Sequence, residues 1–204
     1  MFQQLSGVNA VIMFAGSICA SAGLDGNTAA MAIMGIQVIL TGISCLLMDR
    51  AGRRLLLLFA SSSMAIGHII LAYYFLARDV EGLVAPPMLA LVALGIFIIG
   101  FSLGLGPIPW LLLAEIFPTE VRGNASSLAT AVNWLCSYIV TLSFLQIQEA
   151  ISKQGTFLLF SIVCLLCFLF VMLLVPETKG KTVDEVLRLL RAPAMSIRTV
   201  RRTE

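Results

Sequence analysis

The residues of this sequence whose types and spacing suggest chemistry are amides and hydroxyls that interrupt long apolar runs. Within residues 123–148 one set recurs at intervals of three or four residues: Ser126, Thr130, Asn133, Ser137 and Thr141. At about 100° per residue, these positions lie on one side of a helix. Hydrogen bonds between helices would explain part of this polar stripe. For Asn133 we favour a second interpretation, in which the helix lines a hydrophilic path, because an amide is less expected than a hydroxyl as a packing group.

Further amides occur in two other apolar runs. Gln3, Gln4 and Asn9 do not share a face of an ideal helix, and the intervening Gly7 is expected to break the helix there. Gln37 stands at helical spacing from Thr41 and Ser44. Amides offer donors and acceptors and require no counter-ion, so they suit the hydroxyl groups of a sugar.

Residues 100–110 form the most irregular apolar run. Pro107 and Pro109 remove backbone donors and are expected to kink a helix, while Gly104 and Gly106 permit bending or close approach. A glycine pair four residues apart would also serve as a helix-packing face. The indole of Trp110 follows directly, and aromatic faces pack on the apolar faces of sugar rings. The run therefore predicts a hinge and a gate that closes over a ligand.

Catalytic and metal-binding arrangements are missing from the apolar runs. They contain no pair of carboxylates and no nucleophile beside a base, which disfavours an intramembrane enzyme. His68 is the one histidine, and we expect it to make a hydrogen bond that packs helices together. Cys164 and Cys167 lie among leucines and phenylalanines, which favours apolar packing over redox chemistry. No metal or cofactor is predicted.

The overall composition explains where these side chains must sit. Of the 204 residues, 59% are hydrophobic and 12% are charged, whereas soluble domains carry about 25% charged residues. Charged residues are absent from six windows, each at least 23 residues long: 1–24, 26–48, 55–77, 82–114, 123–148 and 154–176. About 20 apolar residues in a helix cross a bilayer, and continuous apolar runs do not form β-barrels. The sequence therefore predicts an all-α membrane protein with six transmembrane helices.

The distribution of basic residues predicts the orientation. The connections after the first, third and fifth windows hold 2 of the 13 lysines and arginines, and the other two connections with the tail hold 11. The positive-inside rule then places both termini in the cytoplasm. Charges of mixed sign gather on that side, around residues 49–54 and 115–122. They would anchor the membrane edge or, as we favour, form ion pairs that break when the protein changes shape.

Residues 177–204 are predicted to be a cytoplasmic tail that follows a six-span domain over residues 1–176. Thr182 and Glu185 have the spacing of a capping box, and apolar residues follow at helical intervals up to Pro193. We expect a short amphipathic helix on the inner membrane surface. The basic stretch 198–202 is the only candidate basic cluster, and we interpret it as a solvated or lipid-facing tail, so no nucleic-acid partner is predicted.

Six motifs, in order along the chain, resemble those of the sugar porter family of the major facilitator superfamily. They are Gln3-Gln4-Leu5-Ser6-Gly7-Val8-Asn9, Asp49-Arg50-Ala51-Gly52-Arg53-Arg54, Gly106-Pro107-Ile108-Pro109-Trp110, Glu115 to Gly123, Asn133-Trp134 and Pro176-Glu177-Thr178-Lys179-Gly180. The chain resembles the C-terminal half, spans 7 to 12, of a facilitative glucose transporter of the class III type. That resemblance implies one half of a major facilitator fold, with two inverted three-helix repeats.

The resemblance also implies roles for individual residues. The implied sugar contacts are Gln3, Gln4, Asn9, Gln37, Trp110, Asn133 and Trp134, and the implied gate residues are Gly104, Gly106, Pro107 and Pro109. The implied cytoplasmic charge cluster, which would hold two halves together, is Asp49, Arg53, Arg54, Glu115 and Arg122. Ser102 and Ser137 stand where well-known glucose carriers have Glu and Asn, which would alter hydrogen bonds to the sugar.

These observations predict half of an alternating-access carrier for a hexose or related sugar, by facilitated diffusion or proton symport. An N-terminal six-helix half, or a partner chain, would complete it, and the absence of polar residues before the first apolar run favours a piece of a longer protein. The chain alone is therefore not expected to transport. A sugar sensor or regulatory truncated carrier is the alternative, although the 28 residues after Pro176 are a short tail for a sensor.

Overall fold

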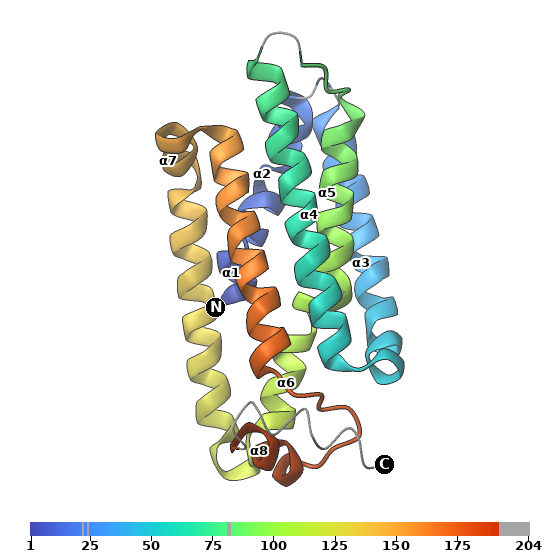
Figure 1. Ribbon diagram of the computed structural model, residues 1–204, viewed down its shortest axis with the longest axis vertical. Helices are drawn as coiled ribbons and strands as arrows, with labels where there is room; N and C mark the ends of the chain where they lie inside the picture. The colour runs from blue at the N-terminus through green and yellow to red at the C-terminus, as the bar shows by residue number, and fades with distance from the viewer. Residues whose placement is uncertain (22, 24, 81–82, 192–204) are drawn as a thin grey trace.

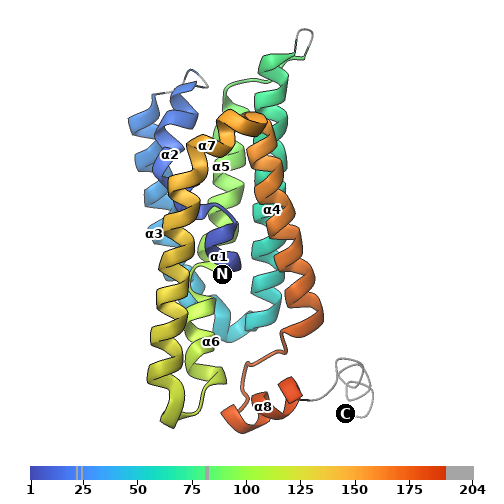
Figure 2. The same cartoon turned by 90° about the vertical axis from the view of Figure 1, so that its left-hand side faces the viewer.

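The computed structural model describes residues 1–21, 23, 25–80 and 83–191. The elements within them are helical: α1 (Phe2–Leu5), α2 (Val8–Ser21), α3 (Gly26–Ala51), α4 (Arg53–Asp79), α5 (Met88–Gly100), the π-helix η1 (Phe101–Leu105), α6 (Ile108–Ile116), α7 (Thr119–Leu174) and α8 (Val183–Arg191). Met1 lies at mid-height of the bundle, whereas α8 lies across one end (Figures 1 and 2). Pro193 and the basic stretch 198–202 lie outside the described residues.

The predicted six apolar crossings are confirmed in the described part of the chain. Five helical segments are long and apolar enough to cross a membrane. One of them, α7, has non-helical backbone at Ile151 and Ser152, where it folds back on itself (Figure 1). Counting α7 twice gives six. The first crossing consists of α1 and α2, and the fourth consists of α5, η1 and α6.

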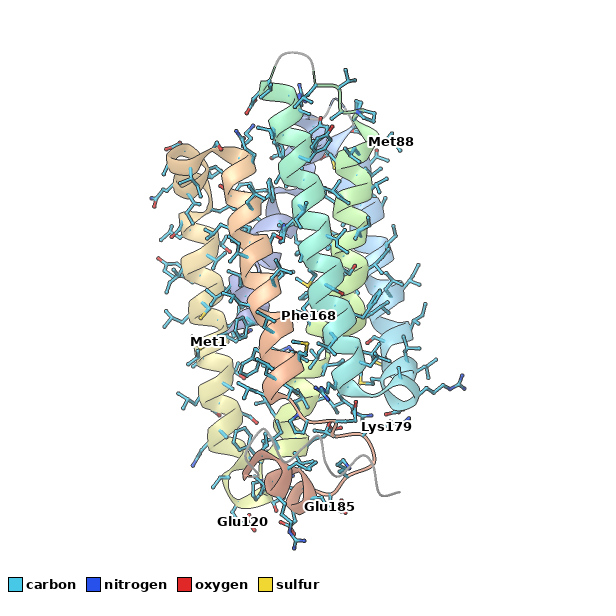
Figure 3. The ribbon with its side chains drawn as sticks, viewed as in Figure 1. Met1, Met88, Glu120, Phe168, Lys179 and Glu185 are labelled. Atoms are coloured by element: carbon cyan, nitrogen blue, oxygen red, sulfur yellow. The ribbon has the colours of Figure 1, made fainter. Side chains whose placement is uncertain are left out.

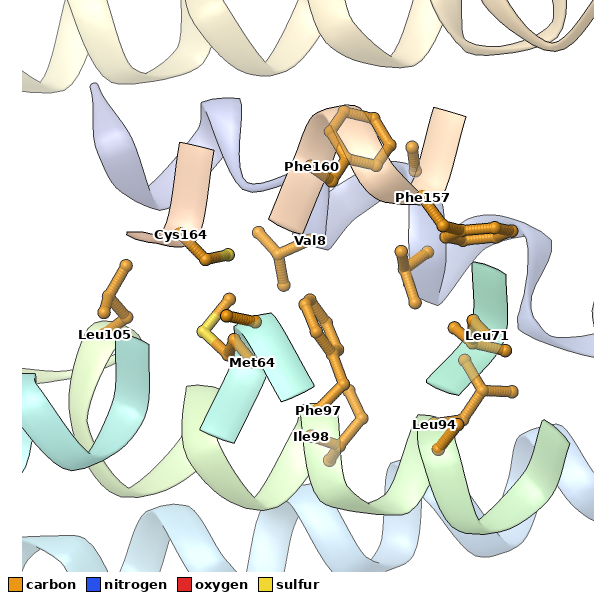
Figure 4. Packing of buried hydrophobic residues seen from close by; sticks show 14 of the residues in the cluster. Val8, Met64, Leu71, Leu94, Phe97, Ile98, Leu105, Phe157, Phe160 and Cys164 are labelled. Carbon is orange, nitrogen blue, oxygen red and sulfur yellow. The ribbon is translucent and has the colours of Figure 1, made fainter. Parts of the chain in front are cut away.

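The core of the bundle lies around α4, which packs against α5 on one side and the second half of α7 on the other. Met64 of α4, Phe97 of α5 and Phe157 and Phe160 of α7 are all almost completely buried (Figure 4). Side chains also project outward from the helices of the bundle (Figure 3). On α3 and α7 many of these exposed side chains are apolar, for example Val38 and Leu142. A bundle that is apolar inside and outside is suited to lipid rather than water.

The short helix α8 begins with the predicted capping box. Glu185 Oε2 accepts a 2.7 Å hydrogen bond from the backbone N–H of Thr182, and the Thr182 hydroxyl also donates to it at 3.0 Å. These bonds, the backbone bond first, lower the pKa of Glu185, with smaller contributions from Lys181 and Arg188. On the apolar face Val186 is fully buried, which fixes α8 against the bundle.

The capping box makes the start of α8 sensitive to pH. Because the pKa of Glu185 is lower in the folded chain, its stabilising effect is present above the ordinary glutamate pKa and is lost as pH falls through the lowered value. We expect the Thr182 amide signal, followed by NMR, to shift on acidification as its bond to Glu185 weakens, and the Val183 signal to lose its helical shift. In Glu185→Gln these signals should change little over the same range. An identical acid transition in both proteins would contradict this role.

Candidate functional site

The first crossing is broken at Gly7, as its sequence predicts. Gly7 has a φ of 79°, and a Cβ at this position would lie 2.7 Å from the ring of Phe160. Only glycine adopts such backbone at low cost, and here only glycine fits. The bend separates α1, which carries Gln3 and Gln4, from α2, which carries Asn9. Amides that do not share one face of a straight helix are therefore brought together.

Gln3 connects the first crossing to the fourth. Its Nε2 donates to the carbonyls of Leu105 and Gly106, at 2.8 and 2.9 Å. In an α-helix the Leu105 carbonyl would accept from residue 109, but that residue is Pro109 and has no N–H. Gln3 supplies the missing donor from another helix. It is 7% exposed, so its amide is buried in this contact.

Pro107 creates a second free carbonyl, which is satisfied in the same way. An α-helical bond to the Leu103 carbonyl would need the N–H of residue 107, which proline lacks. Ser44 of α3 donates its hydroxyl to that oxygen at 2.9 Å. Between the prolines and α5, η1 is a π-helical turn closed by a 2.7 Å bond from the Gly106 N–H to the Phe101 carbonyl. The predicted distortion of this segment is therefore present, and its free carbonyls bind the first and second crossings.

Asn9 joins three helical segments by hydrogen bonds. Its Nδ2 donates to Gln4 Oε1 of α1 at 2.8 Å and to Ser137 Oγ of α7 at 2.5 Å. Ser137 belongs to the predicted polar stripe of the fifth crossing, and its buried hydroxyl faces the bundle. At Asn133 and Ser137 the stripe is buried in the bundle, whereas Ser126, Thr130 and Thr141 are partly exposed. Its serine at position 137 serves here to hold Asn9.

Gln3 and Asn133 line one cavity of about 200 Å³ between the first, third, fourth, fifth and sixth crossings. Asn133 is 6% exposed, and its Nδ2 has no hydrogen-bond partner in the structure. Buried amide donors nearly always have a partner, and one without a partner costs about 1–3 kcal/mol. The rest of the lining is mainly apolar and includes Phe2, Leu57 and Phe170. The cavity thus offers polar groups beside an apolar wall, which is the chemistry that a sugar ring requires.

Other predicted contacts lie apart from this cavity. Trp134 is 61% exposed and lines a second, open hollow of about 530 Å³ together with Ser137 and Thr141. Trp110, 39% exposed, and the half-buried Gln37 line neither of these two cavities. Ser102, on η1, is completely buried and its hydroxyl has no partner. The four predicted gate residues, Gly104, Gly106, Pro107 and Pro109, lie at the distorted segment between α5 and α6. Gly104 packs so closely on α4 that a Cβ there would be 2.5 Å from the Leu56 carbonyl oxygen.

The charge cluster at the end that carries α8 is centred on Arg53. Its guanidinium lies 2.9 Å from Glu115 Oε1 and 3.2 Å from Asp49 Oδ1. Arg54 instead donates to the Met172 carbonyl at 2.6 Å, and Arg122 donates to the Phe117 carbonyl at 3.1 Å. Three of the five predicted residues are therefore joined by ion pairs. Arg54 and Arg122 make hydrogen bonds to main chain.

Glu177 is a member of this cluster that the site prediction omitted. Its Oε1 accepts from the backbone N–H of Arg53 at 2.9 Å, and its Oε2 accepts from that of Arg54 at 3.2 Å. A carboxylate at this position satisfies amides that a helix start leaves unpaired, and it complements the helix dipole. Gly52, with a φ of 88°, permits the approach, since a Cβ there would lie 2.6 Å from Glu177 Oε2. Next to it, Thr178 donates to Glu115 Oε2 at 2.5 Å.

Comparison with known proteins agrees with this arrangement. The family described as "Sugar (and other) transporter" matches residues 1–190. The facilitated trehalose transporter Tret1 of Bombyx mori is 43% identical over 203 residues, which cover 98% of this chain and 40% of that protein. Trehalose transporter 1 of Drosophila melanogaster is 40% identical over 193 residues, covering 92% of this chain and 22% of that protein. The chain thus spans less than half the length of these relatives.

Solved structures show the same fold. The proton:xylose symporter XylE, a major facilitator protein bound to 6-bromo-6-deoxy-D-glucose, superposes with a TM-score of 0.81 at 29% identity, covering 93% of this chain and 41% of that one. The inward-open xylose transporter XylE from E. coli gives 0.78 at 30% identity, covering 93% and 39%. The chain has the expected fold of half a major facilitator transporter. It belongs to the sugar transporter family of the major facilitator superfamily.

Proposed function

We propose that this chain forms one half of a membrane carrier that moves a hexose or a related sugar by alternating access. The observation that carries the proposal is the cavity that both Gln3 and Asn133 line, in which the Asn133 amide nitrogen has no partner. A neutral solute rich in hydroxyls would satisfy that amide without a counter-ion. The relatives are transporters of trehalose and xylose by name, which supports a sugar as the solute.

A second half is part of the proposal. The cavity is lined by residues of α1, α4, α6 and α7, among others. The outward faces of α3 and α7 present apolar side chains that need lipid or protein cover. An N-terminal six-helix half, or a partner chain, would enclose the sugar and cover part of these faces. The two halves would rock about the site, with the first and fourth crossings as gates and Trp110 and Trp134 facing the partner.

We further propose that the end carrying α8 faces the cytoplasm. Among the described residues, eight of the ten lysines and arginines belong to connections at that end or to residues 179–191, and the positive-inside rule assigns such an end to the cytoplasm. The ion pairs of Arg53 and the tail that follows residue 176 would then lie at the inner membrane surface. Movement of the halves would act on this cluster, because mixed charges at an interface can be exchanged between two conformations.

Replacing Asn133 tests the site. In the complete carrier that contains this chain, reconstituted in liposomes, Asn133→Ala should raise the KM for labelled glucose or trehalose about three- to tenfold, because one hydrogen bond to the sugar is lost. Asn124→Ala is the matched control, since Asn124 lies on the same helix with an exposed side chain. Equal KM values for both variants would remove Asn133 from the site. Sugar uptake by the 204-residue chain alone would contradict the proposed need for a second half.

A further inference from the structure

The bend between α1 and α2 leaves a buried carbonyl that the helix itself does not pair. In an uninterrupted helix the Ser6 carbonyl would accept from the N–H of Ala10, but the positive φ of Gly7 turns the chain and α2 begins at Val8. His68, from the middle of α4, brings its Nε2 to 3.0 Å from this oxygen. Because a carbonyl only accepts, His68 donates from Nε2.

The position of His68 is fixed by its surroundings. The residue is 0% exposed, and its ring centroid lies 4.6 Å from that of Phe97, 5.9 Å from that of Phe157 and 5.6 Å from that of Phe160. These rings belong to α5 and to the second half of α7. Phe160 also covers Gly7, as described above. The bend is therefore held by His68 at its carbonyl and by Phe160 at its glycine.

Packing alone does not account for a histidine at this position. Its second nitrogen, Nδ1, is buried with no partner in the structure, and such a group costs free energy that an apolar side chain of similar size would avoid. The cost is offset by the one bond that His68 makes. That bond acts at the point where the first crossing changes direction.

The direction of the bend decides where the amides of the first crossing lie. Of these, Gln3 lines the cavity, whereas Gln4 and Asn9 line neither cavity and are joined to each other beside it. Gln4 before the bend and Asn9 after it meet at 2.8 Å, and Gln3 reaches the fourth crossing. We propose that His68 is a positioning residue for the sugar site, which holds the Ser6 carbonyl and so keeps these amides converged. His68 does not itself line either of the cavities described above. This role rests on the proposed function of the carrier.

The test compares a variant that removes the donor with one that keeps it. His68→Phe fills the space without an N–H, whereas His68→Gln retains an N–H at similar reach. In the complete carrier without sugar, His68→Phe should raise hydrogen–deuterium exchange of the amides of residues 8–11 about three- to tenfold. In liposomes it should raise the KM for labelled sugar by a similar factor, with the maximal rate within about twofold of wild type. His68→Gln should restore both values.

A matched control separates this role from general loosening of α4. Ser61→Ala removes another buried hydrogen bond of α4, from the Ser61 hydroxyl to the Leu57 carbonyl of the same helix. It should leave the exchange of residues 8–11 and the KM unchanged. If His68→Phe fails to fold, His68→Met replaces it, because methionine is more flexible and also lacks a donor. The same rise in exchange at residues 8–11 and in KM is expected.

Two results would overturn the inference. Unchanged exchange at residues 8–11 in the donor-free variants would show that His68 does not hold the bend. Raised exchange with an unchanged KM would show that the bend does not position the sugar site. Absence of sugar uptake by the wild-type carrier would refute the proposed function instead, and the exchange measurement would still decide whether His68 holds the bend.

Discussion

Replacing Arg53 by methionine is expected to destabilise the folded chain by about 3–5 kcal/mol. The side chains of Arg53 and Glu115 are 11% and 20% exposed, so the substitution leaves a largely buried carboxylate without its ion-pair partner. It also removes the guanidinium bond to the Met48 carbonyl. Unfolding in detergent, followed by tryptophan fluorescence, measures the loss.

Arg50→Met provides the control on the same turn. Arg50 is exposed, and the contact that it makes with Lys179 uses its backbone carbonyl, which the substitution keeps. A change of at most about 0.5 kcal/mol is expected there. If both variants lost the same stability, general loss of positive charge would explain the effect and the ion pairs would not.

The second large effect is expected at the bend of the first crossing. Gly7→Ala should destabilise the chain by about 2–5 kcal/mol, because an L-residue at positive φ costs about 1–2 kcal/mol and overpacking adds about 1–3. The new methyl group would lie 2.7 Å from the ring of Phe160. The same unfolding measurement reports the change.

Gly95→Ala is the matched substitution in a helix with free space. Apart from its chain neighbours and the nearby backbone of α5 itself, no described atom lies within 4 Å of a Cβ at Gly95. Alanine in a helix is favoured over glycine by up to about 1 kcal/mol, so this variant should be as stable as the wild type or more stable. A similar loss of stability in Gly7→Ala and Gly95→Ala would refute a special role for the bend at Gly7.

Much of this fold could be predicted because its signals are local. Windows without charge predicted the six crossings, Gly7 predicted the break in the first, and Pro107 and Pro109 predicted the distortion of the fourth. Each is a direct consequence of backbone chemistry at or near the residue concerned. The turn in α7 at Ile151 and Ser152 was likewise marked by charges on both sides, at Glu149 and Lys153.

The partners of these residues could not be predicted in the same way. Glu177 caps the start of α4 although it lies 124 residues away in the sequence. Neither local residue spacing nor composition predicts a contact over that separation. The hydrogen bond predicted for His68 is present, but its acceptor lies 62 residues away at a bend in another crossing. Arg122 has the charge expected of the cluster yet bonds to a nearby carbonyl, because distance in three dimensions decides which charges meet.

The two bonds of Gln3 have a consequence for the polarity of the cavity. Both hydrogens of its Nε2 are directed at main-chain oxygens, so only its Oε1 remains to meet a guest. A guest hydroxyl that meets Gln3 must therefore donate a proton to Oε1. An alcohol can do this, whereas an ether oxygen has no proton to give.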